Sequence, residues 1–419
     1  MTAVQVCSTS FLGMGRAQAR GLGYADLPIA VMPHPFGTLT RDGVRTLAVS
    51  LVADIASLAC KSTDAVAAGT PAQTECAALV DVGADADDVN ALFRAQGWTD
   101  GLPVVAPTQK RVQRMLEATT RHPDEIVARL PPGFGAATVQ RIAINAVMAG
   151  CDPACMPVLI AAVEAVTPPE FNVQTIQTTT NPATVWLIVN GPIAQDLGMN
   201  GNLNCLGQTN WANATLGRAL HLILLNIGRA VPGELDRATH GQPGKYTFCC
   251  AENETETPWE PLHVEKGYRA DQSTVTVVGA EGTLNMNTHT KNADEILNVI
   301  AATLPRPPSN DYLNGGNPWI VLSPEHAHIL HAAGLTKAQV KSRLWEQSKM
   351  SVRLLPPIDF ARIQSVRGPE LGTFTQDTLL PIATTPDNIG ILVAGGPGTH
   401  STYVPSLGST RSVTRVILP

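Results

Sequence analysis

Two short runs of strand-forming residues lie on either side of a helical stretch near the start of the chain, and this alternation constrains the fold most strongly. The runs cover residues 4–7 (VQVC) and 28–32 (PIAVM), and the helical stretch covers residues 13–22. A second helix is expected over residues 41–60. This order predicts a βαβα unit. Such a unit buries too little surface to be stable alone.

The first run raises the question of what pairs with it. Only three residues precede residue 4, and an unpaired strand edge promotes aggregation. We therefore expect another polypeptide to complete this sheet in a hetero-oligomer. The alternative is a shortened chain in which the region after the unit acts by itself.

The rest of the chain is long enough for a second, larger domain. With 419 residues, the chain exceeds the usual size of one core. We expect a partial α/β unit over residues 1–60, a small and polar linker over residues 61–85, and a large α/β domain over residues 86–419. Six strands are expected there, and four helices. The strands lie in TDGLPVVAPT (residues 99–108) and cover residues 171–177, 184–190, 273–279, 318–322 and 389–394, and the helices cover residues 87–96, 138–148, 156–166 and a stretch from residue 108.

Two segments of the large region resemble each other. WLIVNGPIAQDLG and WIVLSPEHAHILHAAG each read as a strand, a turn with proline and a helix that ends in glycine. They indicate either an internal repeat of one βα unit or common turn chemistry used twice.

Composition favours a small-molecule partner over nucleic acid or a membrane. The net charge is −6 and no block of Lys and Arg is present, whereas phosphate binding needs clustered cations. No apolar run reaches the ~18 residues of a membrane span, and no signal peptide is evident. We expect a cytoplasmic protein whose eight cysteines are thiols.

The densest group of reactive side chains lies between residues 239 and 263. If KYTFCCA is a strand, Lys245 and Cys249 share one face, and the cation lowers the pKa of the thiol. His240 or His263 then serves as a base, and Glu252 orients it. The alternative is a polar surface hairpin with a core cysteine.

A second thiol candidate is Cys151, in the sequence AGCDPACMP. Its spacing to Cys155 differs from that of thioredoxins and zinc ribbons, so structural zinc is not expected. A metal would need further cysteine ligands. The alternative is a small residue at a βα junction. No cofactor motif is found, because GGPG near residue 396 departs from the dinucleotide pattern.

Two groups of polar residues suggest where a substrate binds. Thr179 and Asn181 follow a predicted strand, and Asn213 with Arg218 begins a predicted helix. Amides at a helix start can hold an anion, with Arg218 as the cationic partner. The alternative for Asn213 is capping of the helix.

The N-terminal strings VQVCSTSF, RAQARGLG and LPIAVMPHPFG resemble the thiol/selenol domain in the selenoprotein subunits of glycine and D-proline reductases. They are more similar to the UGSC family of proteins that carry a selenocysteine or cysteine motif. Cys7 and the turn around His34 match the later part of that pattern, and the redox motif would lie upstream of Met1. The resemblance implies that a partner with Cys or Sec supplies the redox group near His34.

From Trp98 onward, WTDGLPVVAPT, NATLGRA and THGQPGKYTFCCAENE resemble the large uncharacterised region associated with the UGSC family. This resemblance implies thiol-dependent, reductive or lyase-type chemistry on a small polar substrate. We therefore expect an enzyme subunit completed by a small protein. Two alternatives stay open: a self-sufficient Cys/His/Lys hydrolase or transferase, and a non-catalytic binding subunit.

Overall fold

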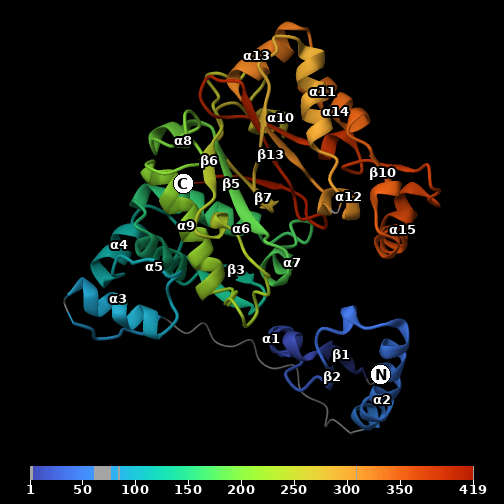
Figure 1. The fold of residues 1–419 in the computed structure, drawn as a ribbon. Coiled ribbons are helices and arrows are strands. Elements are labelled where there is room, and N and C mark those ends of the chain that lie inside the picture. Colours follow the sequence, from blue (N-terminus) through green and yellow to red (C-terminus); the bar gives the residue numbers. More distant parts are fainter. Residues whose placement is uncertain (1–2, 61–76, 84, 308, 419) are drawn as a thin grey trace.

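The computed structural model describes residues 3–60, 77–83, 85–307 and 309–418 (Figure 1). The first of these ranges forms a small N-terminal unit in which two parallel strands pair with each other. Its elements follow the predicted βαβα order, and they are β1 (Gln5–Ser8), α1 (Leu12–Gly21), β2 (Ile29–Met32) and α2 (Arg41–Cys60).

The N-terminal unit leaves much apolar surface uncovered. Val6 in β1 and Val31 in β2 are each 36% exposed, and Leu51 is the one buried residue of α2. Among the described residues, α2 is the one helix long and apolar enough to cross a membrane by length and composition, with 6% of its apolar window buried. The core helix of a soluble protein passes the same test of length and composition. In this unit, the two-stranded sheet offers α2 only a narrow face to pack on.

The unit also contacts the large unit. The Arg237 guanidinium lies 5.9 Å from the ring centroid of Phe11. The predicted linker between the units falls largely outside the described residues, since its residues 61–76 and 84 are not described. Residues 77–83 contain neither helix nor strand.

The large unit contains helices from α3 onward and strands from β3 onward. The helices are α3 (Ala86–Ala95), α4 (Gln109–Leu116), α5 (Val139–Ala149), α6 (Met156–Ala165), α7 (Val173–Thr178), α8 (Pro192–Asp196), α9 (Trp211–Asn226), α10 (Leu262–Glu265), α11 (Ala293–Thr303), α12 (Asn310–Asn314), α13 (Pro324–Ala332), α14 (Lys337–Gln347) and α15 (Pro357–Leu371). The strands are β3 (Ile126–Leu130), β4 (Gly135–Thr138), β5 (Thr184–Asn190), β6 (Cys249–Ala251), β7 (Thr274–Ala280), β8 (Leu284–Asn287), β9 (Trp319–Leu322), β10 (Met350–Ser351), β11 (Leu379–Leu380), β12 (Gly390–Val393), β13 (His400–Val404) and β14 (Val413–Val416).

Two four-stranded sheets form the centre of the large unit. The first has the order β14-β7-β5-β6 and the second the order β8-β13-β9-β12. In each sheet the last pair is parallel and the other pairs are antiparallel. The two sheets therefore share one strand pattern.

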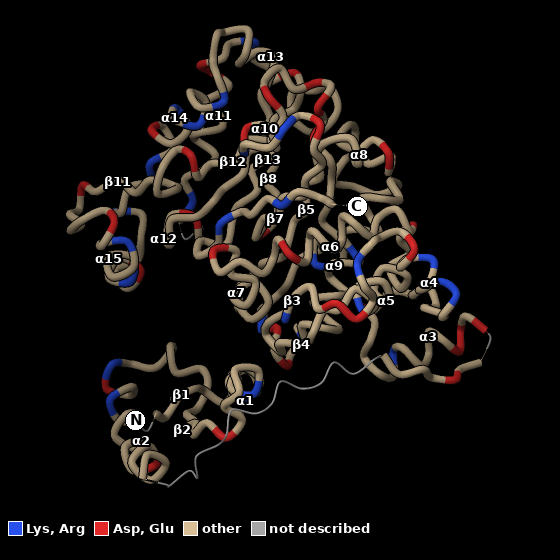
Figure 2. The backbone as a smooth tube through the Cα atoms, turned by 180° about the vertical axis from the view of Figure 1, so that it is seen from behind, with Lys and Arg blue, Asp and Glu red and all other residues tan. Residues whose placement is uncertain are grey.

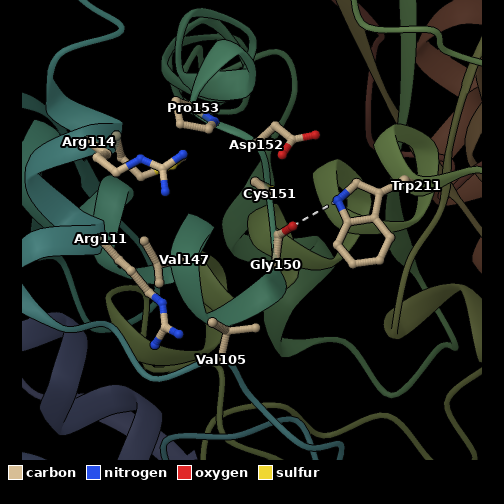
Figure 3. A pocket seen from close by; sticks show the side chains of 10 residues that line it. Val105, Arg111, Arg114, Val147, Gly150, Cys151, Asp152, Pro153 and Trp211 are labelled. Carbon is tan, nitrogen blue, oxygen red and sulfur yellow. Dashed lines mark hydrogen bonds between the residues drawn. The ribbon is translucent and has the colours of Figure 1, made fainter.

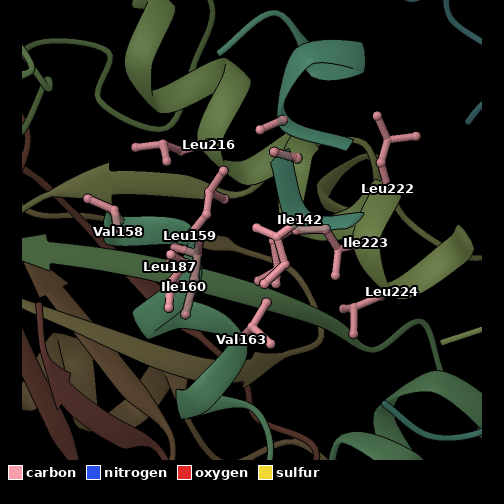
Figure 4. Close-up of a cluster of buried hydrophobic side chains, with 14 of the residues drawn as sticks. Ile142, Val158, Leu159, Ile160, Val163, Leu187, Leu216, Leu222, Ile223 and Leu224 are labelled. Atoms are coloured by element: carbon pink, nitrogen blue, oxygen red, sulfur yellow. The ribbon is translucent and has the colours of Figure 1, made fainter. Parts of the chain in front are cut away.

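The sheets pack face to face, and helices cover both outer faces. Alternate residues of β5 point to opposite sides, so Trp186 belongs to the core between the sheets and Leu187 to the core under α5, α6 and α9. Figure 4 shows the second of these cores, to which Leu159, Leu187 and Leu216 contribute side chains. Helices α11, α13 and α14 cover the second sheet in the same way. The result is a helix–sheet–sheet–helix arrangement, which confirms the predicted α/β class.

The two similar segments of the sequence fold alike. β5 leads into α8 and β9 leads into α13, and both helices begin with proline. Trp186 and Trp319 occupy matching positions, and their rings meet edge to face at 5.8 Å between the sheets. The two segments thus fold alike and pack on each other.

The large unit has two halves, of which the first carries β5, β6 and β7 and the second carries β9, β12 and β13, and they exchange a strand. β7 belongs to the first sheet, but β8, which follows it, pairs with β13 of the second sheet. Likewise β13 is followed by β14, which pairs with β7 of the first sheet. Each half therefore supplies an edge strand to the other sheet.

Three predicted strands are wrong in whole or part. Residues 173–178 form α7, because Asn172 adopts a left-handed conformation and its side chain caps the helix. Residues 99–107 form turns and extended chain without sheet partners. In KYTFCCA only the last three residues form a strand, since Pro243–Lys245 is a 3-10 helix. Lys245 and Cys249 therefore do not share a strand face.

Candidate functional site

A pocket of about 230 Å³ opens between α4, the end of α5 and the start of α9 (Figure 3). Arg111 and Arg114 of α4 lie on one side of it, and Trp211 of α9 lies on the other. Cys151 and Asp152 line it between them. A second hollow of about 360 Å³ shares both arginines and adds Lys110. The pocket thus combines cations with a thiol.

Local sequence explains how α4 presents its cations. Thr108 caps the helix by accepting a hydrogen bond from the Arg111 backbone N at 3.4 Å. Val112 and Met115 are buried, so the polar residues of the helix face outward. The Arg111 guanidinium donates to the Ala106 carbonyl at 3.0 Å.

Two of these cations are available to an anion. Among the described residues, Lys110 and Arg114 have no hydrogen-bond or ion-pair partner. Figure 2 shows the resulting concentration of positive charge along α4. A desolvated or partly enclosed anion would pair with these groups in preference to water.

Cys151 reaches the pocket because α5 ends abruptly. Gly150 caps the helix at φ 90°, in the left-handed region that glycine adopts without strain. Its carbonyl oxygen accepts a hydrogen bond from Trp211 Nε1 at 3.0 Å, which fixes the indole beside the thiol. Trp211 is 63% exposed, so its ring offers an apolar wall to a ligand.

A second thiol, that of Cys155, affects Cys151. The interaction between the two thiols lowers the pKa of Cys155, while burial, followed by the interaction with Cys155, raises the pKa of Cys151. Cys155 is also the N-cap of α6, where the helix dipole favours a thiolate. Cys155 is therefore the more acidic thiol and Cys151 the more accessible one.

The predicted nucleophile Cys249 lies behind this pair. It is buried in β6, and burial followed by the charge of Cys155 raises its pKa far above the usual range. Lys245, its predicted activator, instead pairs with Asp236 at 2.5 Å. His240 is exposed in the loop before Lys245. The structure therefore does not bring these three side chains into one site.

Glu252 and His263 do lie in one cluster, at the end of β5 and β6. Glu252 Oε2 accepts hydrogen bonds from Asn190 Nδ2 at 2.6 Å and Leu262 N at 2.7 Å. The same Asn190 amide donates to Glu254 Oε1 at 2.8 Å, and His263 Nδ1 lies 3.7 Å from that oxygen. Burial raises the pKa of Glu252 to about 7. The carboxyl groups of Glu252 and Glu254 thus share one amide.

The predicted substrate-binding residues mostly bind the protein itself. Arg218 forms a two-bond ion pair with Asp100 at 2.7 and 2.9 Å, and this pair anchors the turn that leads to α4. The side-chain amide of Asn213 accepts a hydrogen bond from the backbone N of Asn200 and donates to the backbone carbonyls of Asn200 and Cys205. Both side chains support the fold around the pocket.

The other three predicted binding residues are spread over the molecule. Thr179 Oγ1 accepts a hydrogen bond from Asn181 Nδ2 at 3.0 Å, and Asn181 Oδ1 accepts from Asn310 Nδ2 at 3.2 Å. In the N-terminal unit, His34 is exposed and its Nδ1 lies 3.1 Å from Ser8 Oγ. These groups are not part of the pocket.

Sequence reasoning missed Arg111, Arg114 and Trp211. The signal for the arginines was QKRVQR, with three cations within five residues after a capping threonine. Nothing in the sequence places that helix over Cys151. In the described part of the chain, no group of three or more His, Cys, Asp or Glu side chains is arranged to hold a metal ion.

Comparisons with known proteins bear on one part of the chain. No curated protein and no solved structure gives a significant match. Residues 1–61, which contain β1, α1, β2 and α2, match the model of the UGSC family, so the resemblance seen in the N-terminal sequence is confirmed for that unit.

Proposed function

We propose that this protein is a subunit of a thiol-dependent enzyme that acts on a small, negatively charged organic substrate in the pocket of Cys151. One observation carries the proposal: the Cys151 thiol and the unpaired Arg114 guanidinium line the same cavity. The volume of about 230 Å³ suits a small metabolite rather than a polymer.

The residues divide the work by their chemistry. Arg111 and Arg114 hold the anionic group of the substrate, and Trp211 limits the water around it. Cys151 loses its proton to solvent, and its sulfur then attacks the electrophilic atom of the substrate. This arrangement supports the thiol chemistry that the sequence predicts, with Cys151 in place of Cys249.

The N-terminal unit supports a partner chain as the second part of the proposal. Two paired strands with exposed edges are fewer than a stable parallel sheet requires. A small protein that adds strands would bury Val6 and Val31 and bring its own Cys or Sec near His34. The enzyme is then a hetero-oligomer.

A second candidate rests on the Glu252 cluster. A buried carboxyl group with a raised pKa, close to a second carboxyl group and to His263, is suited to acid–base catalysis. They favour a hydrolase or transferase without thiol chemistry. The residues of this cluster do not line the pocket of Cys151, which makes it the weaker candidate.

Alkylation with two reagents of similar size tests the thiol site. Iodoacetate is an anion and iodoacetamide is neutral, and the rate of Cys151 modification is measured for each by peptide mass spectrometry. We expect Cys151 to prefer iodoacetate over iodoacetamide more strongly than the exposed Cys60 does. Arg114→Gln should reduce this preference about three- to tenfold, as for one charge-assisted contact at a partly exposed site.

The control is Arg94→Gln, which removes the same charge from exposed α3 outside the pocket. If Cys151 reacts with neither reagent, or if Arg94→Gln has the effect of Arg114→Gln, the proposed site is wrong. Native mass spectrometry of the protein from its own host tests the partner. A homo-oligomer without a second subunit would overturn that part alone.

A further inference from the structure

A row of three polar side chains crosses the end of the first sheet. Asn190 of β5 pairs with Thr274 of β7, and the register of β5 with β6 continues so that Glu252 lies on its other side. Because side chains alternate along a strand, Asn190 points to the same face of the sheet as Trp186, into the space between the two sheets. The three side chains are therefore neighbours on an enclosed face.

Each of these side chains has a buried atom without a hydrogen-bond partner among the described residues. The atoms are Asn190 Oδ1, Glu252 Oε1 and Thr274 Oγ1, and the residues are 0%, 5% and 0% exposed. His263 of α10 adds a fourth such atom, Nδ1, and is 1% exposed. Buried polar atoms in folded proteins are almost always hydrogen-bonded, so four unpaired atoms in one cluster indicate a ligand.

The four atoms share one chemistry, because each of them can accept a hydrogen bond. Amide and carboxylate oxygens only accept, and a hydroxyl oxygen can accept as well as donate. His263 Nε2 lies 3.4 Å from the Ala270 carbonyl oxygen, which only accepts, so Nε2 carries the hydrogen of the neutral ring and Nδ1 is an acceptor. Nδ1 faces a further acceptor, Glu254 Oε1, at 3.7 Å. The cluster therefore needs hydrogen-bond donors.

The cluster also needs positive charge. Glu252 and Glu254 share the side-chain amide of Asn190, which is neutral. In the described part of the chain, no Lys or Arg forms an ion pair with either carboxyl group. Lys337 approaches α10, but its Nζ donates to Glu265 Oε2 of that helix at 3.0 Å. A cation that donates hydrogen bonds would meet both needs at once.

We propose that the Glu252 cluster, together with Thr274, binds an ammonium group, either as free ammonium or as the end of a primary amine. Ammonium carries one positive charge and up to four N–H donors, whereas a water molecule is neutral and donates two hydrogen bonds. A metal ion fits less well, because hard cations take oxygen ligands and His263 offers nitrogen. The inference goes beyond the thiol chemistry proposed above and does not depend on it.

Glu254 forms the open side of the cluster. Its side chain is 22% exposed, whereas that of His263 beside it is 1% exposed. Its Oε1 accepts hydrogen bonds from Gly191 N at 2.7 Å and Asn190 Nδ2 at 2.8 Å, so the carboxyl group is held in place. The carbon chain of a bound amine would therefore leave the cluster beside Glu254.

Calorimetric titration of the full chain tests the site. Ammonium, methylammonium and tetramethylammonium chlorides are added separately at constant ionic strength. We expect saturable binding of ammonium and none of tetramethylammonium, which has the same charge but no N–H bond. Saturable binding of methylammonium would assign the site to a primary amine, and its absence would assign the site to free ammonium.

Variants of the cluster place the bound cation. Glu252→Gln should weaken ammonium binding at least about tenfold, because it removes a charged acceptor. Thr274→Val keeps the shape of the side chain and should weaken binding about two- to tenfold, so it decides the matter if the first variant does not fold. The control is Asp311→Asn, which should leave binding unchanged, since Tyr403 and Ser406 already donate to that buried carboxyl group.

Three results would overturn the inference. The first is no saturable binding of ammonium, and the second is equally tight binding of potassium chloride, which has no N–H bond. The third is equal affinity of the wild type, Glu252→Gln and Thr274→Val, which would place the cation elsewhere. None of these results bears on the alkylation of Cys151, because the cluster does not line that pocket, so the proposed function is tested separately.

Discussion

The two halves of the large unit can be compared position by position, because Trp186 and Trp319 fix their alignment. At the ends of β5 and β6 the first half carries Asn190, Glu252 and Glu254. The corresponding positions after β9 and β12 are Ser323, Ala394 and Gly396. The same strand pattern therefore ends in polar, titratable groups in one half and in small residues in the other.

The small residues have a packing role. A side chain at Gly396 would lie 2.2 Å from Leu203, and Gly395 N donates to the Gly201 carbonyl at 2.8 Å. The second half thus holds the loop near residues 200–205 of the first half closely. The comparison teaches that the reactive groups are concentrated in one half while the other provides support.

The largest expected effect tests whether the halves are equivalent in the core. Trp186→Ala and Trp319→Ala should each lower the free energy of unfolding by about 3–5 kcal/mol, because each removes a large ring from between the sheets. Thermal or urea denaturation measures both. A loss below about 1 kcal/mol for one variant alone would show that the halves do not share the core equally.

The next effect is a pH dependence of stability, which arises from different buried carboxyl groups in the two halves. The folded protein binds the Glu252 proton more tightly than the unfolded chain, since burial raises its pKa from 4.5 to about 7. Stability should therefore fall as pH rises between these values, by on the order of 2–3 kcal/mol. Glu252→Gln should remove the share that Glu252 contributes in urea titrations at several pH values, whereas Glu281, whose pKa burial also raises to about 7, should keep a dependence over the same range.

The second half supplies the control for that prediction. Burial raises the pKa of Asp311 from 3.8 to about 6, although Tyr403 and Ser406 donate hydrogen bonds to it. Asp311→Asn should remove a smaller dependence over that lower range. An unchanged pH profile in Glu252→Gln would contradict the assignment of a share of this titration to Glu252.

A smaller effect is expected where the second half supports the first. Asn213→Ala should cost about 1–3 kcal/mol, because it leaves buried backbone groups of Asn200 and Cys205 without partners. Limited proteolysis near residues 200–205 should speed up in parallel. Faster cleavage would show that Gly395 and Gly396 of the second half cannot hold the loop of residues 200–205 without Asn213. Unchanged cleavage would show that these two glycines hold the loop without it.

The smallest effect on stability is expected in the pocket. Asp152→Asn should change the free energy of unfolding by less than about 0.5 kcal/mol, because Asp152 is exposed. It should nevertheless lower the pKa of Cys155, since the Asp152 charge raises it, and increase the preference of Cys151 for iodoacetate. The pH dependence of alkylation measures both. A decrease in that preference would contradict an electrostatic role for the pocket.

Sequence patterns predicted much of the fold. Strands such as β5 and β7 were found because unbroken apolar, β-branched runs fit a strand buried on both faces. The α7 segment was missed because a left-handed Asn172 and local capping overrode its strand-like composition. The strand exchange could not be predicted, since it depends on pairing between residues more than a hundred positions apart.

The site was predicted only in part. Cys151 was named as a candidate, and Glu252 and His263 do lie together. Arg218 was assigned to a substrate, but the sequence cannot show that Asp100 reaches it from a distant turn. Arg114 was missed for the converse reason, because only the folded chain brings α4 beside the end of α5.

The exchanged strand also affects how the protein is made. β7 ends at Ala280, but its partner β14 begins at Val413, so the first sheet lacks an edge until the second half has been synthesised. At ordinary elongation rates this interval lasts on the order of ten seconds. A ribosome that pauses within the second half would lengthen the exposure of β7, and the nascent chain would then depend on chaperones to avoid aggregation.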